Sequence, residues 1–395
     1  MSSIFNPPLH RQRHQFVIDF VMKNKPRRVA DLGCSECRLL KQLKFHREIE
    51  QLVGVDVNGG KIKKKMHGLG PLSADYLQPT YDQLQIELYQ GSVTQRDARL
   101  RGFDLVTCIE LIEHLTLTDL EHFSAVVFGY TTPVNVIVST PNSEFNVLLP
   151  GLSGFRDRDH KFEWNRAEFK SWALKVCFEY GYDVEFTGVG EAPPGQQDCV
   201  GFCTQIGVFH RRRGRDHCGA LPGDGGETVF PYTLLYSVNY PSLRDNNTLR
   251  RVLVSEVLYW AEQIKNRWIE EKSVCEEEVE ALMDYSGRRD DKELLWTSDP
   301  KQPEFGTLNN VVSVPLAALW SCCPKVGELS GSLGNLRHLL MDEPEVQLNQ
   351  DGSAVLVKYQ EQDQDVDTDL EDGEDSEGSQ CFYRAEQEED WEADV

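Results

Sequence analysis

Between residues 25 and 211, short apolar runs alternate with longer amphipathic stretches, and this alternation constrains the fold more than any other feature of the sequence. Apolar runs of this length are typical of strands buried on both faces of a parallel sheet, and the stretches between them are typical of covering helices. Helical periodicity extends over Thr118–Tyr130 and Arg166–Tyr180, with Thr118 and Asn165 as expected N-caps. The predicted strands cover residues 27–33, 51–57, 86–92, 103–109, 134–140, 182–190 and 204–210.

The last two predicted strands follow one another without a helix between them. Only the stretch EAPPGQQDCVGFC, residues 191–203, separates them, and its prolines and glycines indicate a turn. An antiparallel hairpin that closes an otherwise parallel sheet is the arrangement of class I methyltransferases. We therefore predict the α/β fold class, with a Rossmann-like sheet that is mostly parallel and has an antiparallel last strand.

The net charge of −23 is unevenly distributed along the chain. Residues 1–215 contain 27 Lys and Arg against 25 Asp and Glu, so the excess acid lies in the remainder and a nucleic-acid partner is not excluded. In that remainder, Leu249–Trp268 has the pattern of an amphipathic helix and Glu270–Pro303 that of a charged linker. We predict a lead-in over 1–24, the sheet domain over 25–215, an extension with partial helix and strand over 216–358, and a disordered acidic tail over 359–395.

Composition argues against a membrane or secreted protein. The sequence contains no apolar run of about 18 residues, and its N-terminus has no apolar segment before a small-residue cleavage site. The 11 cysteines are odd in number and lack the dense spacing of a disulfide scaffold. We expect reduced thiols, a cytoplasmic location and, as the favoured oligomeric state, a monomer.

A candidate cofactor site lies where the first two predicted strands end. The segment VADLGCSECRLL places Asp31 and Gly33 at the end of a strand and then enters a helix, whose N-terminal amides are suited to a bound ligand. Asp56 follows Gly33 by 23 residues, a position from which it would bind both ribose hydroxyls of an adenosine. Ser92, after the third strand, is where an adenine contact would fall. The pair Cys34 and Cys37 leaves redox or metal binding as a minor alternative for this turn.

A candidate metal site follows the fourth predicted strand. In CIELIEHL, one helical turn would bring Glu113 and His114 to the face that Glu110 occupies. The loop FRDRDHKFEW, after the fifth strand, offers His160 at the same edge of the sheet. Carboxylates combined with imidazole suit Mg²⁺ or Mn²⁺ with positions left open for substrate. We therefore expect Glu110, Glu113, His114 and His160 to share one divalent cation.

Taken together, these segments resemble the small-RNA 3′-terminal 2′-O-methyltransferases, in particular the short animal enzymes that modify PIWI-interacting RNAs. The resemblance extends over residues 7–210, just over half of the chain. The segments that carry it are DLGCSECRLL, LVGVDV, LYQGSV, FDLVTCIELIEHL, VIVSTPNSEFN, RDRDHKFEWNRAEFKSWA, VEFTGVGE and CTQIGVF.

The resemblance implies that S-adenosyl-L-methionine donates a methyl group to the 2′-hydroxyl of the 3′-terminal nucleotide and so protects small single-stranded RNAs. It implies metal binding by Glu110, Glu113, His114 and His160, and cofactor contacts by Gly33, Asp56 and Ser92, with Asp31 beside them. Plant-type RNA-binding domains are absent, so a PIWI-type protein would present the RNA, and germ-cell RNA granules would be the site of action. The family glycines are replaced by Ser35 and Cys37, which leaves the contacts to the methionine end of the cofactor open.

The predicted chemistry is consistent with these residues. A divalent metal lowers the pKa of a ribose hydroxyl and orients it for attack on the methyl sulfonium, and the vicinal hydroxyls of a terminal nucleotide can both bind one metal. Either His114 or His160 would then accept the departing proton. Three alternatives remain at this stage: an RNA-end binding module without catalysis, metal-assisted phosphoester hydrolysis, and a small-molecule diol O-methyltransferase.

Contacts to RNA are expected from basic and aromatic side chains around this edge. Phe155, Phe162 and Trp164 flank His160 and are candidates for stacking on terminal bases. The basic candidates for the RNA backbone are Arg27, Arg28, residues 61–65, Arg96, Arg99, Arg101 and residues 211–215.

Overall fold

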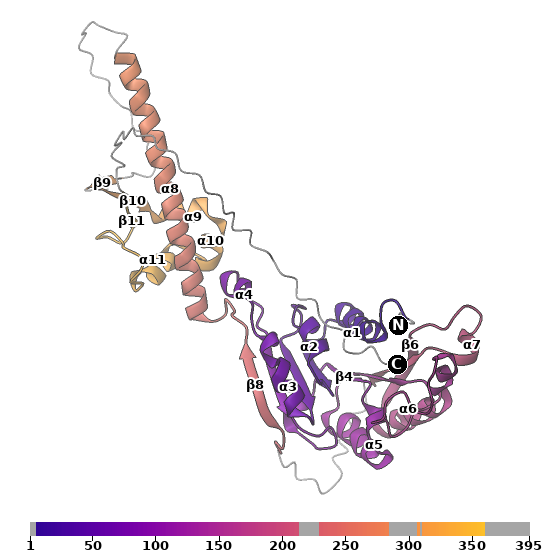
Figure 1. Cartoon of the computed structure of the whole chain (residues 1–395). Helices are drawn as coiled ribbons and strands as arrows, with labels where there is room; N and C mark the ends of the chain where they lie inside the picture. The colour runs from indigo at the N-terminus through magenta and orange to yellow at the C-terminus, as the bar shows by residue number, and fades with distance from the viewer. Residues whose placement is uncertain (1–4, 213–228, 284–305, 309, 360–395) are drawn as a thin grey trace, which may run out of the picture. The chain divides into compact units, whose positions relative to one another are not determined.

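The computed structural model describes residues 5–212, 229–283, 306–308 and 310–359 (Figure 1). These residues divide into two compact units. The first runs to Pro241 apart from the short piece Leu77–Pro79, and the second consists of that piece and the chain from Ser242 onward. Among the described residues, no helix is both long and apolar enough to cross a membrane.

An eight-stranded sheet forms the first unit, in the order β6-β7-β5-β4-β1-β2-β3-β8. The five strands from β5 to β3 are parallel, and β7 runs antiparallel to both β5 and β6. The predicted fold class is therefore confirmed, including the closing hairpin. The strands are β1 Arg28–Leu32, β2 Gln51–Asp56, β3 Gln85–Gln90, β4 Leu105–Ile109, β5 Asn135–Pro141, β6 Tyr182–Val189, β7 Thr204–Arg211 and β8 Thr233–Asn239.

Helices cover both faces of the sheet because its strand residues alternate between two apolar cores. Leu52 packs with α1, α2 and α3 on one face, and its neighbour Val53 packs with α5 and α6 on the other. The larger helices are α1 Leu9–Asn24, α2 Arg38–Leu43, α3 Gly59–Lys65, α5 Leu117–Ser124 and α6 Arg166–Tyr180. Short elements complete the unit: η1 Met66–Leu69, α4 Ser73–Leu77, η2 Ala98–Leu100, η3 Ile112–His114, η4 Ala125–Thr131, η5 Ser143–Leu148 and α7 Gln197–Val200.

The helix ends test the predicted caps. Helix α6 has the predicted bounds, and Asn165 caps it in a reciprocal pair with Glu168. The prediction for α5 is wrong by two residues: Thr116, not Thr118, is the N-cap, and its Oγ1 accepts a hydrogen bond from the Asp119 backbone N–H over 3.1 Å. Thr116 has the extended backbone that a cap requires, with ψ of 160°.

Strand β8 lies beyond residue 215, within the segment that the sequence assigns to the extension. It pairs antiparallel with the edge of β3, from Gln85 opposite Asn239 to Gln90 opposite Thr233. The fully buried Asp97 holds the entry to this strand, because its carboxylate accepts hydrogen bonds from the Tyr232 N–H and from Arg99. Most β8 side chains are exposed or half-buried, so the strand lacks the apolar run that marks the central strands.

The second unit has its own core, built between one long helix and a small antiparallel sheet in the order β11-β10-β9. The predicted helix Leu249–Trp268 lies inside α8, which continues into the predicted linker as far as Met283. The rest of that linker, residues 213–228 and the acidic tail from 360 onward lie outside the described residues, so the predicted disorder stays a prediction. The elements are α8 Asn246–Met283, β9 Gly306–Leu308, β10 Val311–Pro315, α9 Leu316–Cys322, α10 Pro324–Ser330, α11 Leu333–Met341 and β11 Ala354–Lys358.

The carboxylate of Asp31 is buried in the first unit, under the end of β1. Asp31 is 4% exposed, and its Oδ1 accepts a hydrogen bond from the Thr107 hydroxyl on β4 over 2.7 Å. Burial raises the pKa of Asp31 to about 7, with a smaller contribution from the charge of Asp56. The folded chain therefore holds the Asp31 proton over a pH range in which the unfolded chain has already released it.

We predict that Asp31→Asn changes the pH dependence of stability. Between pH 4 and 7 Asp31 binds its proton in the folded wild type but has largely released it in the unfolded chain, so the contribution of Asp31 to the free energy of unfolding falls as pH rises. Asparagine does not ionise, so the stability of Asp31→Asn relative to wild type should rise by up to roughly 4 kcal/mol between pH 4 and 8. Urea denaturation across this range measures the difference, with the exposed Asp82→Asn as control. A difference that does not vary with pH would contradict the buried, protonated Asp31.

Candidate functional site

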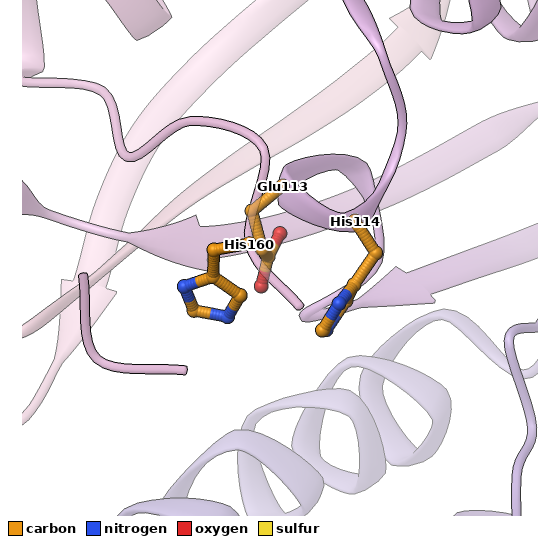
Figure 2. A group of neighbouring side chains, drawn as sticks. All are labelled: Glu113, His114 and His160. Atoms are coloured by element: carbon orange, nitrogen blue, oxygen red, sulfur yellow. The ribbon is translucent and has the colours of Figure 1, made fainter. Parts of the chain in front are cut away.

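Three of the four predicted metal ligands lie together at the carboxyl edge of the sheet. Glu113 and His114 belong to η3, which follows β4, and His160 comes from the loop before α6. Each offers a ligand atom, and these atoms lie within 4.8 Å of one another. Figure 2 shows the carboxylate and both imidazoles directed toward one another. We refer to Glu113, His114 and His160 as the three-residue site; among the described residues no other group of His, Cys, Asp and Glu is placed in this way.

The Glu113 carboxylate is the most constrained member of the three-residue site. Its side chain is fully buried, and Oε2 accepts a hydrogen bond from the Thr140 hydroxyl over 3.0 Å. Oε1 has no hydrogen-bond partner among the described residues. Burial, followed by the charge of Glu110, raises the pKa of Glu113. A buried carboxylate oxygen without a partner is costly, and a bound cation would compensate for it, so the side chains present fit a metal ion.

His160 is held in place by a carboxylate that the sequence did not single out. Its Nδ1 lies 2.6 Å from Glu163 Oε1, and Glu163 also accepts hydrogen bonds from the Asn146 amide and the Arg156 backbone N–H. Burial disfavours ionisation of Glu163, but these hydrogen bonds outweigh it and lower its pKa. With Glu163 ionised, Nδ1 carries the proton and Nε2 is free to bind a cation. The spacing of three residues between His160 and Glu163 in HKFE is the sequence signal from which this pairing could have been predicted.

His114 completes the three-residue site from the other side. Its ring centroid lies 4.9 Å from that of His160, at an interplanar angle of 73°. Burial, together with the neighbouring His160, lowers the pKa of His114. The neutral imidazole is the form that binds metal ions, so this environment favours ligation.

Glu110 lies beside the three-residue site but is not part of it. The predicted helical turn does not start at Glu110, because its backbone is left-handed, with φ of 48°, and η3 begins only at Ile112. Its Oε1 accepts a hydrogen bond from Ser139, and its Oε2 lies 3.3 Å from Nη1 of Arg13 on α1. The metal-ligand role of Glu110 stays a prediction. Arg13 was not found from the sequence, since it lies about a hundred residues away in the lead-in.

The predicted cofactor residues lie at the ends of the neighbouring parallel strands. Gly33 has φ of 81°, and a Cβ there would lie 2.9 Å from the Leu111 side chain, so glycine is required at this turn. The two oxygens of Asp56 accept hydrogen bonds from the backbone N–H groups of Ser35 and Asn58, over 2.9 and 2.7 Å. Asp56 therefore orders the loop around it and still has lone pairs for a ligand.

The two residues that replace family glycines, Ser35 and Cys37, have the backbone conformation that glycine usually adopts. Ser35 and Cys37 have φ of 45° and 61°, in the left-handed region. Cys34 and Cys37 are buried and belong to the core under α2, and neither joins a metal-type group among the described residues. Ser92 is half-buried, and its hydroxyl lies 2.7 Å from that of Thr94. Contacts to the cofactor by Asp31, Gly33, Asp56 and Ser92 stay predictions.

Some of the predicted RNA-contacting residues already contact other residues of the protein, and others are exposed to solvent. Phe162 and Trp164 stack on each other at 4.4 Å and pack against the core, whereas Phe155 is 50% exposed. Several arginines are already paired within the protein: Arg27 with Glu50, Arg28 with Gln51, Arg99 with Asp97, and Arg211 with the Thr132 carbonyl. Basic residues 213–215 lie outside the described residues.

Residues 247–359 match the family model described as the HENMT1 C-terminal domain. Among solved structures, the small RNA methyltransferase HEN1 aligns at 29% identity over 60% of this chain and 28% of its own, with a TM-score of 0.48. The methyltransferase domain of bacterial CtHen1 aligns at 38% identity over 51% of this chain and 99% of its own, with a TM-score of 0.43.

Two vertebrate relatives match over nearly the whole length of both proteins. The small RNA 2′-O-methyltransferase of Gallus gallus is 44% identical over 362 residues, which are 89% of this chain and 94% of the relative. That of Xenopus tropicalis is 44% identical over 361 residues, 89% of this chain and 96% of the relative. The Drosophila melanogaster enzyme of the same name is 33% identical over 69% of this chain and 73% of its own. The chain therefore belongs to the family of small RNA 2′-O-methyltransferases.

Proposed function

We propose that this enzyme transfers the methyl group of S-adenosyl-L-methionine to the 2′-hydroxyl of the 3′-terminal nucleotide of small single-stranded RNAs. We further propose that it uses one divalent cation, Mg²⁺ or Mn²⁺, at the three-residue site. Family membership supports RNA 2′-O-methylation. The observation that carries the metal is the fully buried Glu113 carboxylate: its Oε1 has no partner among the described residues, and one of its oxygens lies within 4.8 Å of ligand atoms on two imidazoles.

The donor set decides the kind of cation. One carboxylate and two imidazoles combine hard and borderline ligands, whereas no thiolate joins the site among the described residues. Glu110 would supply a fourth ligand if its carboxylate turned away from Ser139 and Arg13. A cation held there would act as a Lewis acid that lowers the pKa of the ribose hydroxyl.

The chain's own residues position the reactants. Glu163 fixes the orientation and tautomer of His160, and Thr140 fixes the Glu113 carboxylate. In this scheme the proton of the 2′-hydroxyl would pass to His114 or His160, whichever imidazole has a nitrogen that is not bound to the cation. The cofactor supplies the electrophilic methyl group, and Gly33, Asp56 and Ser92, with Asp31 beneath them, would hold it at the adjoining strand ends.

Further proposals rest on the family resemblance. A PIWI-interacting RNA would be the substrate, presented by a PIWI-type protein, and methylation would protect its 3′ end. The enzyme would act as a monomer in the cytoplasm, in the RNA granules of germ cells.

Glu113→Gln and His160→Ala should abolish methyl transfer and leave cofactor affinity nearly unchanged, because each removes a ligand atom from the three-residue site without touching the ends of β1 and β2. Transfer of labelled methyl groups and calorimetry with S-adenosyl-L-methionine measure the two effects, and Mn²⁺ binding can be followed by electron paramagnetic resonance. His122→Ala, at an exposed histidine of α5, is the matched control. Near-normal transfer by either variant at limiting metal would remove that residue from the proposed site.

Asp56→Ala should weaken binding of S-adenosyl-L-methionine by roughly 2–3 kcal/mol, the loss expected for two charge-assisted hydrogen bonds to the ribose. Isothermal calorimetry gives the affinity. Because Asp56 also orders its own turn, Asn58→Ala serves as control: it removes the cap of α3 from the same turn and leaves the carboxylate in place. Unchanged affinity in Asp56→Ala, or an equal loss in Asn58→Ala, would argue against ribose binding by Asp56.

Selection of the RNA end tests the proposed function itself. An RNA ending in a 2′,3′-diol should be methylated, a 3′-deoxy end should react slowly, and a 2′-deoxy end should not react. A 3′-phosphate should be excluded, because it adds negative charge beside Glu110 and Glu113. One time course over RNAs with the four ends, with mapping of the methylated sugar, tests whether the enzyme selects its substrate by the RNA end. Equal rates for the diol and the 3′-phosphate, or methyl groups on internal riboses, would contradict end recognition.

A further inference from the structure

An uncharged loop protrudes next to the three-residue site. Residues 147–155, VLLPGLSGF, contain no charged side chain, although charged residues make up 27% of the sequence. We call this segment the apolar loop. Val147 is 79% exposed and Phe155 is 50% exposed. Gly151 and Gly154 have positive φ, and a Cβ at either would have no atom within 4 Å, so the loop extends into open space.

Both ends of the apolar loop are fixed to the carboxylate that holds His160. Asn146, directly before the loop, donates a hydrogen bond from its side-chain amide to Glu163 Oε2 over 2.8 Å. Arg156, directly after it, donates its backbone N–H to Glu163 Oε1 over 2.5 Å. The same Oε1 lies 2.6 Å from Nδ1 of His160. Glu163 therefore links both ends of the loop to the candidate metal ligand His160 through hydrogen bonds.

The Arg156 side chain stabilises both ends of the apolar loop, and each of its three nitrogens donates a hydrogen bond within the protein. Nε donates to Asn146 Oδ1 over 2.7 Å, Nη2 to the Asn142 carbonyl over 2.6 Å, and Nη1 to the Cys203 carbonyl over 3.0 Å. The next five residues, 157–161, are Asp, Arg, Asp, His and Lys, so acidic and basic side chains are mixed there. This surface therefore offers an apolar face rather than a cluster of cations for phosphate groups.

The chemistry of an RNA end decides what such a face can bind. Phosphates are anionic and riboses carry hydroxyls, so only the bases present flat, largely apolar surfaces, and an aromatic ring stacks on any of them. Of the three aromatic residues that flank His160, Phe162 and Trp164 stack on each other and support the core. Phe155 is the one whose ring is half exposed.

We propose that the apolar loop is a contact surface for bases at the RNA 3′ end, and that Phe155 stacks on one of the last three bases. This inference rests on the proposed function, which puts the terminal ribose at the three-residue site. Stacking does not read base identity, so the loop would add affinity for any RNA end without a sequence preference.

Phe155→Ala should raise KM for a short single-stranded RNA roughly 5- to 150-fold, the range expected for loss of one stacked base, with kcat little changed. Phe155→Trp should retain wild-type KM because it keeps an aromatic face. The matched control is Phe178→Ala: Phe178 is 85% exposed on α6, about 20 Å along the helix from Asn165. Melting temperatures establish that each variant is folded.

Abasic RNAs then identify the contact. A base is removed at each of the last three positions in turn, and binding to wild type and Phe155→Ala is measured by fluorescence anisotropy. Removal of the stacked base should weaken binding to wild type and leave binding to Phe155→Ala unchanged. Equal losses in both proteins at all three positions, or unchanged KM and affinity in Phe155→Ala, would overturn the proposal. Failure of the proposed function is distinguishable, since wild type would then fail to methylate the intact RNA while the anisotropy result still decides the contact.

Discussion

The hydrogen bonds to the buried Glu163 carboxylate bind together the parts of the chain from which the site is made. Its two oxygens accept hydrogen bonds from His160 at the candidate metal site, from the Asn146 side chain before a loop and from the Arg156 backbone N–H after that loop. Its side chain is 1% exposed, so the carboxylate can be ionised there only because these donors replace water. The orientation of an imidazole and the position of a surface loop thus depend on one anion.

Glu113 and Glu163, at this edge of the sheet, have pKa values shifted in opposite directions because their surroundings differ. Glu113 is buried with one hydrogen bond, and its pKa is raised. The Glu163 side chain is also shielded from solvent but accepts hydrogen bonds from three donors, and its pKa is lowered. A site that keeps one carboxylate under-bonded is less stable than a well-packed core would be, and it gains a preference for a positive ion. Asp31, under β1, has the same kind of environment as Glu113.

The central strands and α6 were predictable from the sequence because burial on two faces and a capping box leave plain patterns. The exposed edge strand β8 has no such pattern, and its place depends on Asp97 and on the free edge of β3. At the site, the strand-end argument predicted that Glu113, His114 and His160 lie at the same edge of the sheet, and there the structure places them together. The left-handed backbone of Glu110, and its pairing with Arg13, depend on contacts between segments far apart in the sequence, which periodicity cannot reveal.

The pairing of β8 with β3 also determines where the chain can be divided. A piece that ended at residue 215, where the charge pattern changes, would keep every residue of the three-residue site but leave the whole edge of β3 unpaired. An open edge with apolar residues such as Ile86 and Leu88 is a template for strands of other molecules, and therefore for aggregation. The smallest self-sufficient form of the first unit accordingly includes the segment through Asn239, and the boundary of the catalytic domain is set by hydrogen bonding along a sheet edge rather than by the last residue that takes part in chemistry.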